Sequence, residues 1–293
     1  MKVLVTGASG NVGKGIVPRL VEAGHDVVLY DVNELPDVAA FKGLTFIQGD
    51  IQAGVGLDHA AAGCDAIVHT PAWHGIHWRA KTEADFWRLN VDGTFWAYQA
   101  AQNAGITRFV FLSSTAWYGH YDKYGFTKRV GEELCEYNRI THGINYVAIR
   151  PNDFTPWGDD YLRYGSRLLY GGVDRDDVLD CVSLAVDWLS TARTAAEGIV
   201  VHAVKPNVYS ADLIEGWETA PTEVCERVFP GSRALVEKYG IDIRRKPDLS
   251  SQDEGALKIG YAPTRHFGTF IDDLRRLDKE QGEAVVRSIK CPY

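Results

Sequence analysis

Three residues in this chain have types and spacings suited to proton transfer. Tyr124 and Lys128 lie four positions apart, so on a helix both side chains share one face. A phenol with an ordinary pKa of about 10 is a poor base at neutral pH. A neighbouring ammonium favours the phenolate and lowers that pKa toward the working range. Ser114 ends an apolar run ten residues earlier and can polarise a hydroxyl or carbonyl oxygen.

A glycine-rich turn at the start of the chain predicts a phosphate-binding site. The apolar, β-branched run Lys2–Thr6 is followed by Gly7, Gly10 and Gly13, and then by apolar residues at helical spacing. Gly7 allows a sharp turn, Gly10 allows the backbone to approach a pyrophosphate, and Gly13 allows the helix to pack on the strand. The helix N-terminus offers free N–H groups and a partial positive charge. This pattern predicts a dinucleotide cofactor.

Asp31 indicates which dinucleotide is bound. It follows the apolar segment Asp26–Tyr30, eighteen residues past the last glycine. A carboxylate there can accept hydrogen bonds from ribose hydroxyls and would repel a 2′-phosphate, which favours NAD over NADP. The alternative that Asp31 only starts a turn stays open. Asp50, at the end of a third strand over Phe46–Ile51, is expected to face the adenine edge.

Strands and helices alternate over the first 150 residues, which predicts an α/β fold with a doubly wound parallel sheet, Rossmann-like, and a small C-terminal substrate-binding part. The expected strands are Lys2–Thr6, Asp26–Tyr30, Phe46–Ile51, Ala66–His69, Arg108–Leu112, Ile144–Ile149 and Gly198–Ala203. The expected helices include Glu83–Asn103, Asp122–Thr141, Val178–Ser190 and one near His266–Val286. The predicted nucleotide-binding core is 1–150, with a strand and helix returning at about 172–204, and the substrate-binding part is 151–171 and 205–293.

The composition excludes several classes of function. A formal net charge of −8 argues against nucleic acid and anionic membranes as partners. Five cysteines are scattered without metal-finger spacing, which suits a reducing cytoplasm. The first strand begins at residue 2, which leaves no room for a signal peptide, and no apolar run is long enough to span a bilayer. The sequence therefore predicts a cytoplasmic protein with a small-molecule substrate.

Several motifs, taken in order, resemble those of a known family. They are Thr6–Gly13, Gly49-Asp50, Asn90–Thr94, Phe109–Ser114, Tyr124–Lys128 and Arg150-Pro151. Together they resemble an extended short-chain dehydrogenase/reductase, and more narrowly the NAD-dependent epimerase/dehydratase family of sugar-modifying enzymes. The resemblance is close over about the first 150 residues and resumes at Gly172–Val178 and Ala256–Pro263.

The resemblance implies roles for particular residues. Lys128 is expected to hold the nicotinamide ribose and to keep Tyr124 ionised, while Ser114 holds the developing oxyanion. The expected contacts of NAD are Gly7, Ser9, Gly10, Asn11, Val12, Gly13, Asp31, Asp50, Ile51, Thr70, Asn90, Lys128 and Arg150. The helices Glu83–Asn103 and Asp122–Thr141 are those that the family uses to pair subunits, so a homodimer is expected. Trp96, Tyr98 and Phe126 either serve in that pairing or belong to the core.

Departures from the family pattern narrow the chemistry. Thr115-Ala116 stands where the family's sugar-nucleotide dehydratases and decarboxylases carry acidic residues, which argues against both reactions. The ten-residue separation of Ser114 and Tyr124 is short, so either Thr115 takes over the polar role or the site is more open. The segment from Arg150 to Asp174 lacks room for the insertion that grips a nucleotide diphosphate. These features favour a dehydrogenase of a free sugar, uronate or lactol.

The substrate contacts predicted from the sequence are Trp73, His74, Thr115, Asn152, Arg163 and Arg167. Trp73 and Trp78 either contact substrate or pack under their loop. His69, His74 and His77 invite a zinc interpretation, but no carboxylate or cysteine completes a ligand set, so no metal is expected. Two other functions stay open. One is a nucleotide-sugar 4-epimerase with tightly bound NAD, and the other is a non-catalytic NAD-binding sensor.

Overall fold

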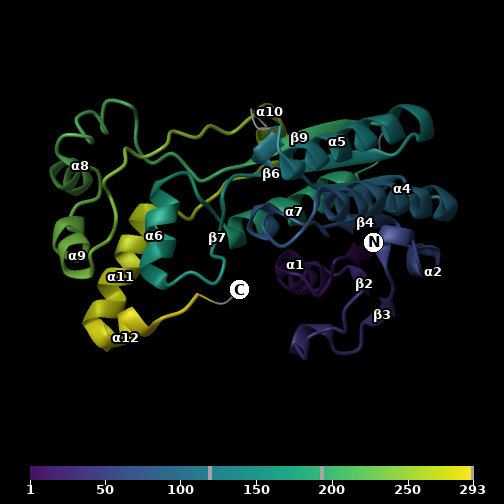
Figure 1. Ribbon diagram of the computed structural model, residues 1–293, viewed down its shortest axis with the longest axis horizontal. Helices are drawn as coiled ribbons and strands as arrows, with labels where there is room; N and C mark the ends of the chain where they lie inside the picture. The colour runs from purple at the N-terminus through teal and green to yellow at the C-terminus, as the bar shows by residue number, and fades with distance from the viewer. Residues whose placement is uncertain (118–120, 192–194, 292–293) are drawn as a thin grey trace. The chain divides into compact units, whose positions relative to one another are not determined.

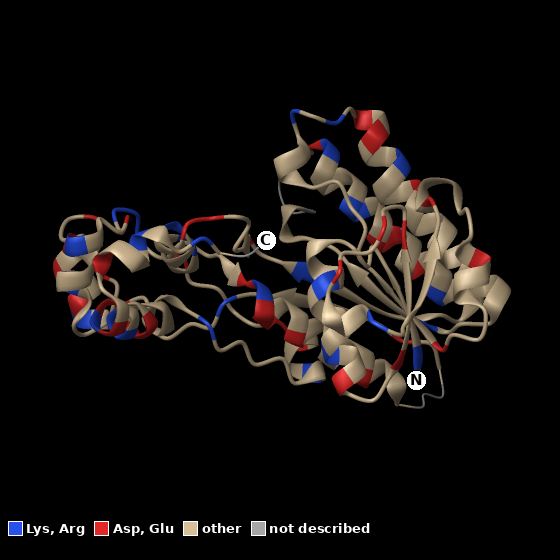
Figure 2. Cartoon of the chain, turned by 90° about the horizontal axis from the view of Figure 1, so that it is seen from below, with Lys and Arg blue, Asp and Glu red and all other residues tan. Residues whose placement is uncertain are grey.

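The computed structural model describes residues 1–117, 121–191 and 195–291 and divides the chain into two compact units. The first unit contains residues 1–150, 179–202 and 254–260, and the second contains 151–178, 203–253 and 261–293. Figure 1 shows the elements along the chain. Acidic and basic residues are interspersed along the helices of each unit (Figure 2). Among the described residues, no helix has the length and apolar character needed to cross a membrane.

A seven-stranded sheet with the order β3-β2-β1-β4-β5-β6-β9 forms the centre of the first unit (Figure 1). Its strands are β1 (Lys2–Thr6), β2 (Asp26–Asp31), β3 (Thr45–Gln48), β4 (Ala66–His69), β5 (Arg108–Leu112), β6 (Asn145–Pro151) and β9 (Gly198–Ala203). The first six strands pair in parallel. The predicted doubly wound, Rossmann-like sheet is confirmed, and its strand order reverses between β1 and β4, where such folds bind ligands.

Helices lie between these strands along the chain, and one more helix of the first unit follows the last strand. They are α1 (Asn11–Glu22), α2 (Leu57–Ala61), α3 (Glu83–Phe86), α4 (Gly93–Ala104), α5 (Lys123–His142), α7 (Arg175–Ser190) and α10 (Glu254–Ile259). Short turns of 3-10 helix lie at Ala39–Phe41, Ile51–Ala53, Gly75–His77 and Thr115–Trp117. The helix expected over Glu83–Asn103 contains a π-helical segment, Trp87–Asp92, between α3 and α4. Such segments often occur at functional sites, and this one carries Asn90.

The strands are buried on both faces. Leu4 and Phe109 belong to one apolar cluster that includes residues of α2, α4 and α5, while Val3 and Val5, of the opposite parity, are also fully buried. Tyr98 stacks on Phe109 with ring centroids 4.0 Å apart and is 1% exposed. Tyr98 is therefore a core residue and cannot serve in subunit pairing.

The second unit has a core of its own. Its elements are the parallel pair β7 (Phe154–Thr155) and β8 (Val173–Asp174), and the helices α6 (Tyr161–Leu169), α8 (Pro221–Val228), α9 (Ser232–Tyr239), α11 (Phe267–Gln281) and α12 (Glu283–Ser288). Trp217 is fully buried and donates its indole N–H to the Ile243 carbonyl at 2.7 Å. Phe270 packs so closely on α6 that a Cβ at Gly165 would lie 2.2 Å from its ring.

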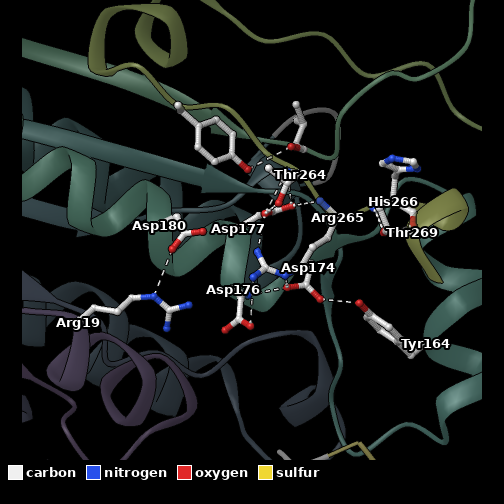
Figure 3. Close-up of polar contacts among 12 residues, drawn as sticks. Arg19, Tyr164, Asp174, Asp176, Asp177, Asp180, Thr264, Arg265, His266 and Thr269 are labelled. Atoms are coloured by element: carbon white, nitrogen blue, oxygen red, sulfur yellow. Dashed lines mark hydrogen bonds and ion pairs between the residues drawn. The ribbon is translucent and has the colours of Figure 1, made fainter. Parts of the chain in front are cut away.

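A buried carboxylate joins two distant segments of the second unit. Asp177, 1% exposed, accepts hydrogen bonds from the backbone N–H groups of Thr264 and Arg265 and a 2.8 Å ion pair from the Arg265 guanidinium (Figure 3). Arg265 also lies 3.5 Å from Asp174, which in turn accepts the Tyr164 hydroxyl at 2.7 Å. Asp177 therefore fixes the segment that leads into α11.

Replacing Asp177 with asparagine is expected to lower the free energy of unfolding by about 2 kcal/mol, because several charge-assisted hydrogen bonds weaken together. Asp176→Asn is the matched control, since Asp176 is half exposed and meets the same arginine at 3.6 Å. Urea denaturation of both variants measures the difference. Equal losses would contradict the assignment of this role to Asp177.

Candidate active site

The glycine turn has the geometry of a backbone cradle. Gly7 has a φ of +74°, and a Cβ there would lie 2.6 Å from the Thr70 hydroxyl. At Gly13 a Cβ would lie 2.4 Å from the Gly7 carbonyl oxygen, whereas at Gly10 it would meet only that oxygen, at 3.1 Å. The helix therefore packs directly on the turn, while the backbone at Gly10 stays accessible to a ligand.

Asp31 lies at the carboxyl end of β2, beside this turn. One of its carboxylate oxygens accepts the Ser9 backbone N–H at 2.9 Å, and the other accepts that of Asn33 at 2.9 Å. Asp31 thus starts a turn, as the alternative proposed, and also contacts the glycine loop. Asp50 accepts the Gln52 N–H and caps the short helical turn that begins at Ile51. The ribose and adenine roles of these residues stay predictions.

Tyr124 and Ser114 lie together. The Ser114 hydroxyl is hydrogen-bonded to the Tyr124 phenol and also accepts the Ala116 N–H at 3.1 Å. The pKa of Tyr124 is nevertheless raised, because burial disfavours the phenolate more than the Ser114 hydrogen bond favours it. The expected lowering of this pKa is therefore wrong for the protein alone. Of the two hydroxyls considered, this contact favours Ser114 over Thr115, although residues 118–120 of the connecting segment lie outside the described residues.

Lys128 follows Tyr124 on the same helix and is 3% exposed. Its ammonium donates to the Leu112 carbonyl at 2.6 Å and lies 5.1 Å from the centre of the Phe111 ring. Burial lowers the pKa of Lys128 to about 7, and the Glu132 carboxylate opposes that shift. The amine thus titrates near neutral pH at the carboxyl end of β5.

Two predicted cofactor contacts are already engaged by the protein. Asn90 is 2% exposed. Its side-chain oxygen accepts the Trp73 N–H, and its side-chain nitrogen donates to the Trp73 carbonyl and to the Thr127 hydroxyl, at 2.8 to 2.9 Å. Arg150 is 8% exposed and donates from two nitrogens to Glu132. Each residue thus bridges elements of the first unit, and a contact of either with NAD stays a prediction.

The loop after β4 places an imidazole near the phenol. The His74 ring lies 6.4 Å from that of Tyr124 and 4.5 Å from that of His77, centroid to centroid. Burial lowers the pKa of His74 to about 4, so this imidazole is neutral at physiological pH. Trp78 is 45% exposed, so it is not packed under the loop, and the Lys81 ammonium lies 4.1 Å over the Trp73 ring.

His69 is separate from these two histidines in its contacts. Its two ring nitrogens lie 3.0 Å and 3.2 Å from the hydroxyls of Thr6 and Thr94. In the described ranges 1–117, 121–191 and 195–291, no cluster of three or more histidine, cysteine or acidic side chains is arranged to hold a metal ion. His69 is therefore a bridging residue of the core.

Burial of His69 predicts a stability loss in acid. Burial lowers its pKa from the ordinary 6.5 to about 3, so the unfolded chain binds the proton more tightly. Stability is full above pH 6.5 and falls as the pH falls toward 3, with a loss of about 2 kcal/mol at pH 5 from this group. Urea denaturation at pH 7 and pH 5 should show a smaller difference for His69→Gln than for the parent chain. His59→Gln, at an exposed position, should match the parent chain; a matching result for His69→Gln would contradict the prediction.

The remaining predicted substrate contacts lie apart in the chain. Thr115 begins a 3-10 turn in the first unit, whereas Asn152, Arg163 and Arg167 belong to the second. Arg163 and Arg167 line a pocket of about 620 Å³ within that unit, together with Arg245 and Tyr170. Arg167 is paired with Asp153 and Asp159, and Arg163 with Asp159 at 3.3 Å. These ion pairs leave Arg163, whose side chain is 71% exposed, as the more available of the two cations.

Sequence reasoning missed Glu132, Ser113 and Thr127, which connect the candidate catalytic residues to their surroundings. The i,i+4 spacing of Lys128 and Glu132 is typical of an ion pair, whereas the Glu132 carboxylate binds Ser113 and Arg150. Its position one helical turn after Lys128 was the available signal. The identity of its partners depends on strand pairing, which spacing does not reveal.

Comparison with known proteins agrees with this geometry. Residues 3–158, more than half of the chain, match the model of the NAD dependent epimerase/dehydratase family. The chain belongs to this family. A curated relative, the 3-beta-hydroxysteroid dehydrogenase of Mycolicibacterium neoaurum, is 38% identical over 182 residues, which are 55% of this chain and 50% of the relative. A UDP-glucose 4-epimerase of Streptomyces lividans is 28% identical over 166 residues, 50% of each chain. The chain thus spans about half the length of these relatives in the family.

Solved structures extend the likeness of fold to nearly the whole chain. MoeE5, in complex with UDP-glucuronic acid and NAD, is 21% identical with a TM-score of 0.66, covering 94% of this chain and 99% of its own. A glucuronic acid dehydrogenase from Chromohalobacter salexigens is 20% identical with a TM-score of 0.64, and the match covers 96% of this chain and 90% of that protein. At this identity the likeness concerns the fold alone, and it includes both units.

Proposed function

We propose that this chain is an NAD-dependent enzyme that moves hydride at an oxygen-bearing carbon of a small sugar-like molecule. The substrate class that we favour is a free sugar, a uronate or a lactol, oxidised by a dehydrogenase. The observation that carries the proposal is the hydrogen bond between Ser114 and Tyr124, one helical turn from the buried Lys128. A phenol, a hydroxyl donor and an ammonium are the groups needed to deprotonate an alcohol and hold the developing charge.

The residues of the first unit fit NAD. The backbone at Gly10 is open to a pyrophosphate, and the Asp31 carboxylate lies beside the same loop, where it can accept ribose hydroxyls. Lys128 would hold the nicotinamide ribose. When bound, NAD supplies the hydride acceptor for oxidation of the alcohol. MoeE5, which shares the fold, was solved with NAD, and this supports the assignment.

The protein's own groups would act on the substrate oxygen. Tyr124 accepts the hydroxyl proton, and Ser114 donates a hydrogen bond to the same oxygen as it gains negative charge. The Lys128 ammonium would favour ionisation of Tyr124, whereas burial raises the pKa of that phenol. The neutral His74 imidazole, which lies near the phenol, and the Trp73 ring would contact the substrate ring.

Three alternative functions are each supported or opposed by a particular feature of the chain or its relatives. UDP-glucose 4-epimerases among the curated relatives support a nucleotide-sugar epimerase that retains NAD, but the short segment after Arg150 argues against a grip on a nucleotide diphosphate. The 38% identity to a 3-beta-hydroxysteroid dehydrogenase, together with Trp73 and the exposed Trp78, supports a flat apolar alcohol as a second candidate substrate. A non-catalytic sensor would not need Tyr124 and Lys128 beside Ser114.

The deciding experiment incubates purified protein with NAD⁺ and a panel of free sugars, uronates, UDP-glucose and a 3β-hydroxysteroid. NADH absorbance and product identity are followed together. Accumulation of NADH with a free sugar or uronate supports the proposal. Isomerised sugar without net NADH would indicate the epimerase, and NADH with the steroid the second candidate. Bound NAD without turnover of any substrate would indicate the sensor.

We also propose a homodimer formed through α4 and α5 and a cytoplasmic location. Phe95, Trp96 and Phe126 are 38% to 43% exposed on these helices, and such aromatic side chains on one pair of helices are typical of a subunit interface. All five cysteines are free, which suits a reducing compartment. Analytical ultracentrifugation tests the dimer, and Trp96→Glu should favour the monomer.

A further inference from the structure

Glu132 is a buried acid for which the proposed reaction gives no role. It lies on α5, one turn after Lys128, and its side chain is 11% exposed. Its carboxylate accepts the Ser113 hydroxyl and two guanidinium nitrogens of Arg150, one of them at 2.7 Å. Burying a carboxylate is costly unless it is paired in this way. The carboxylate is thus held in a fixed position within the first unit.

The groups around Lys128 come from several elements. Tyr124, Glu132 and Cys135 share its helix, His69 comes from β4, His74 from the following loop, and Arg150 from β6. The pKa values of His69 and His74 are lowered to about 3 and about 4 by burial, and that of the Cys135 thiol is raised by burial. These three groups are therefore neutral at pH 7. The Glu132 carboxylate is the anion that favours the Lys128 ammonium.

We propose that Glu132 is a positioning residue: fixed by Ser113 and Arg150, its carboxylate favours the ammonium form of Lys128, one helical turn from Tyr124. The inference rests on the proposed function, because it concerns the same site. Glu132 does not touch the substrate. It acts through Lys128 on the protonation of the phenol.

The expected size of the effect follows from the equilibrium between two states of the pair. In one state Lys128 is charged and Tyr124 is ionised, and in the other both are neutral. Since both states carry the same number of protons, their ratio does not depend on pH. It falls tenfold for each pH unit by which the Lys128 titration midpoint falls. Removal of a nearby opposite charge lowers such a midpoint by about one pH unit or more.

The test is Glu132→Gln, with Glu133→Gln as the matched control on the exposed side of the same helix. ¹³C-labelled lysine is titrated by NMR in the purified protein, and the Lys128 resonance is assigned by its loss in Lys128→Arg. We expect the midpoint to fall by about one pH unit or more in Glu132→Gln and to stay unchanged in Glu133→Gln. In steady-state kinetics kcat should fall by the corresponding factor, about tenfold or more, with KM nearly constant.

A second variant separates this effect from damage to the fold. Glu132→Gln with Arg150→Gln removes both buried charges and leaves no unpaired guanidinium. Loss of the Arg150 cation raises the Lys128 midpoint while loss of the Glu132 anion lowers it, so the midpoint should fall less here than in Glu132→Gln. An unchanged midpoint in folded Glu132→Gln would overturn the inference, and so would a kcat that does not follow the midpoint. If the parent chain turns over no substrate, the proposed function fails separately, and the NMR titration still decides whether Glu132 controls Lys128.

Discussion

Tyr124→Phe is expected to lower kcat by about 10²- to 10⁴-fold while NAD binding stays nearly unchanged. The substitution removes the phenolic oxygen that we propose accepts the substrate proton, and it leaves the ring and its packing in place. Ser114 loses its hydrogen-bonded partner but keeps the Ala116 N–H. Turnover is measured with the substrate identified in the panel, and NAD binding is measured by calorimetry.

The control for this prediction is Tyr121→Phe. Tyr121 lies three residues earlier and is 85% exposed, so loss of its hydroxyl should leave kcat unaltered. Full activity of Tyr124→Phe would exclude Tyr124 as the base. Equal losses of kcat and NAD affinity would instead point to a role in holding the cofactor.

Gly13→Val is expected to abolish NAD binding and to lower the free energy of unfolding by about 1–3 kcal/mol. A Cβ at this position would lie 2.4 Å from the Gly7 carbonyl oxygen and 2.5 Å from that of Ala8, both backbone atoms that cannot rotate away. The helix must therefore move off the turn, which displaces the N–H groups that we propose bind the phosphates. NAD titration and urea denaturation measure the two effects.

Gly75→Ala provides the comparison for this substitution, because no atom lies within 4 Å of a Cβ there. It should retain both NAD affinity and stability. If Gly13→Val binds NAD normally, the glycine turn is not the pyrophosphate site. If it binds normally but unfolds earlier, Gly13 serves packing alone.

The parallel sheet was predictable because each strand is a short apolar run, and burial on both faces removes polar residues from it. Val3, Leu4 and Val5 are all fully buried. The second unit was much less predictable. Its strands, Phe154–Thr155 and Val173–Asp174, are two residues long, and its core draws on residues as distant as Leu168 and Val286. Neither feature leaves a periodic signal within a single window of sequence.

The candidate site was predicted in part. Tyr124, Lys128 and Ser114 could be named because helical spacing and strand ends determine where such side chains meet. The contacts of Asn90 and Arg150 could not be foreseen. The side chain of each forms hydrogen bonds with residues at least seventeen positions away in the sequence, and the fold determines which residues these are. The raised pKa of Tyr124 was also missed, because it is caused mainly by burial, which the spacing of residues on a helix does not reveal.

The way in which Asn90 holds Trp73 has a consequence for substitutions in the proposed substrate loop. The amide of Asn90 grips only the main-chain N–H and carbonyl of Trp73, and it is itself anchored to the Thr127 hydroxyl. The anchor is therefore indifferent to which side chain stands at position 73. Substitutions of residue 73 other than proline should keep both main-chain hydrogen bonds, so directed evolution of the proposed substrate preference can start at this position.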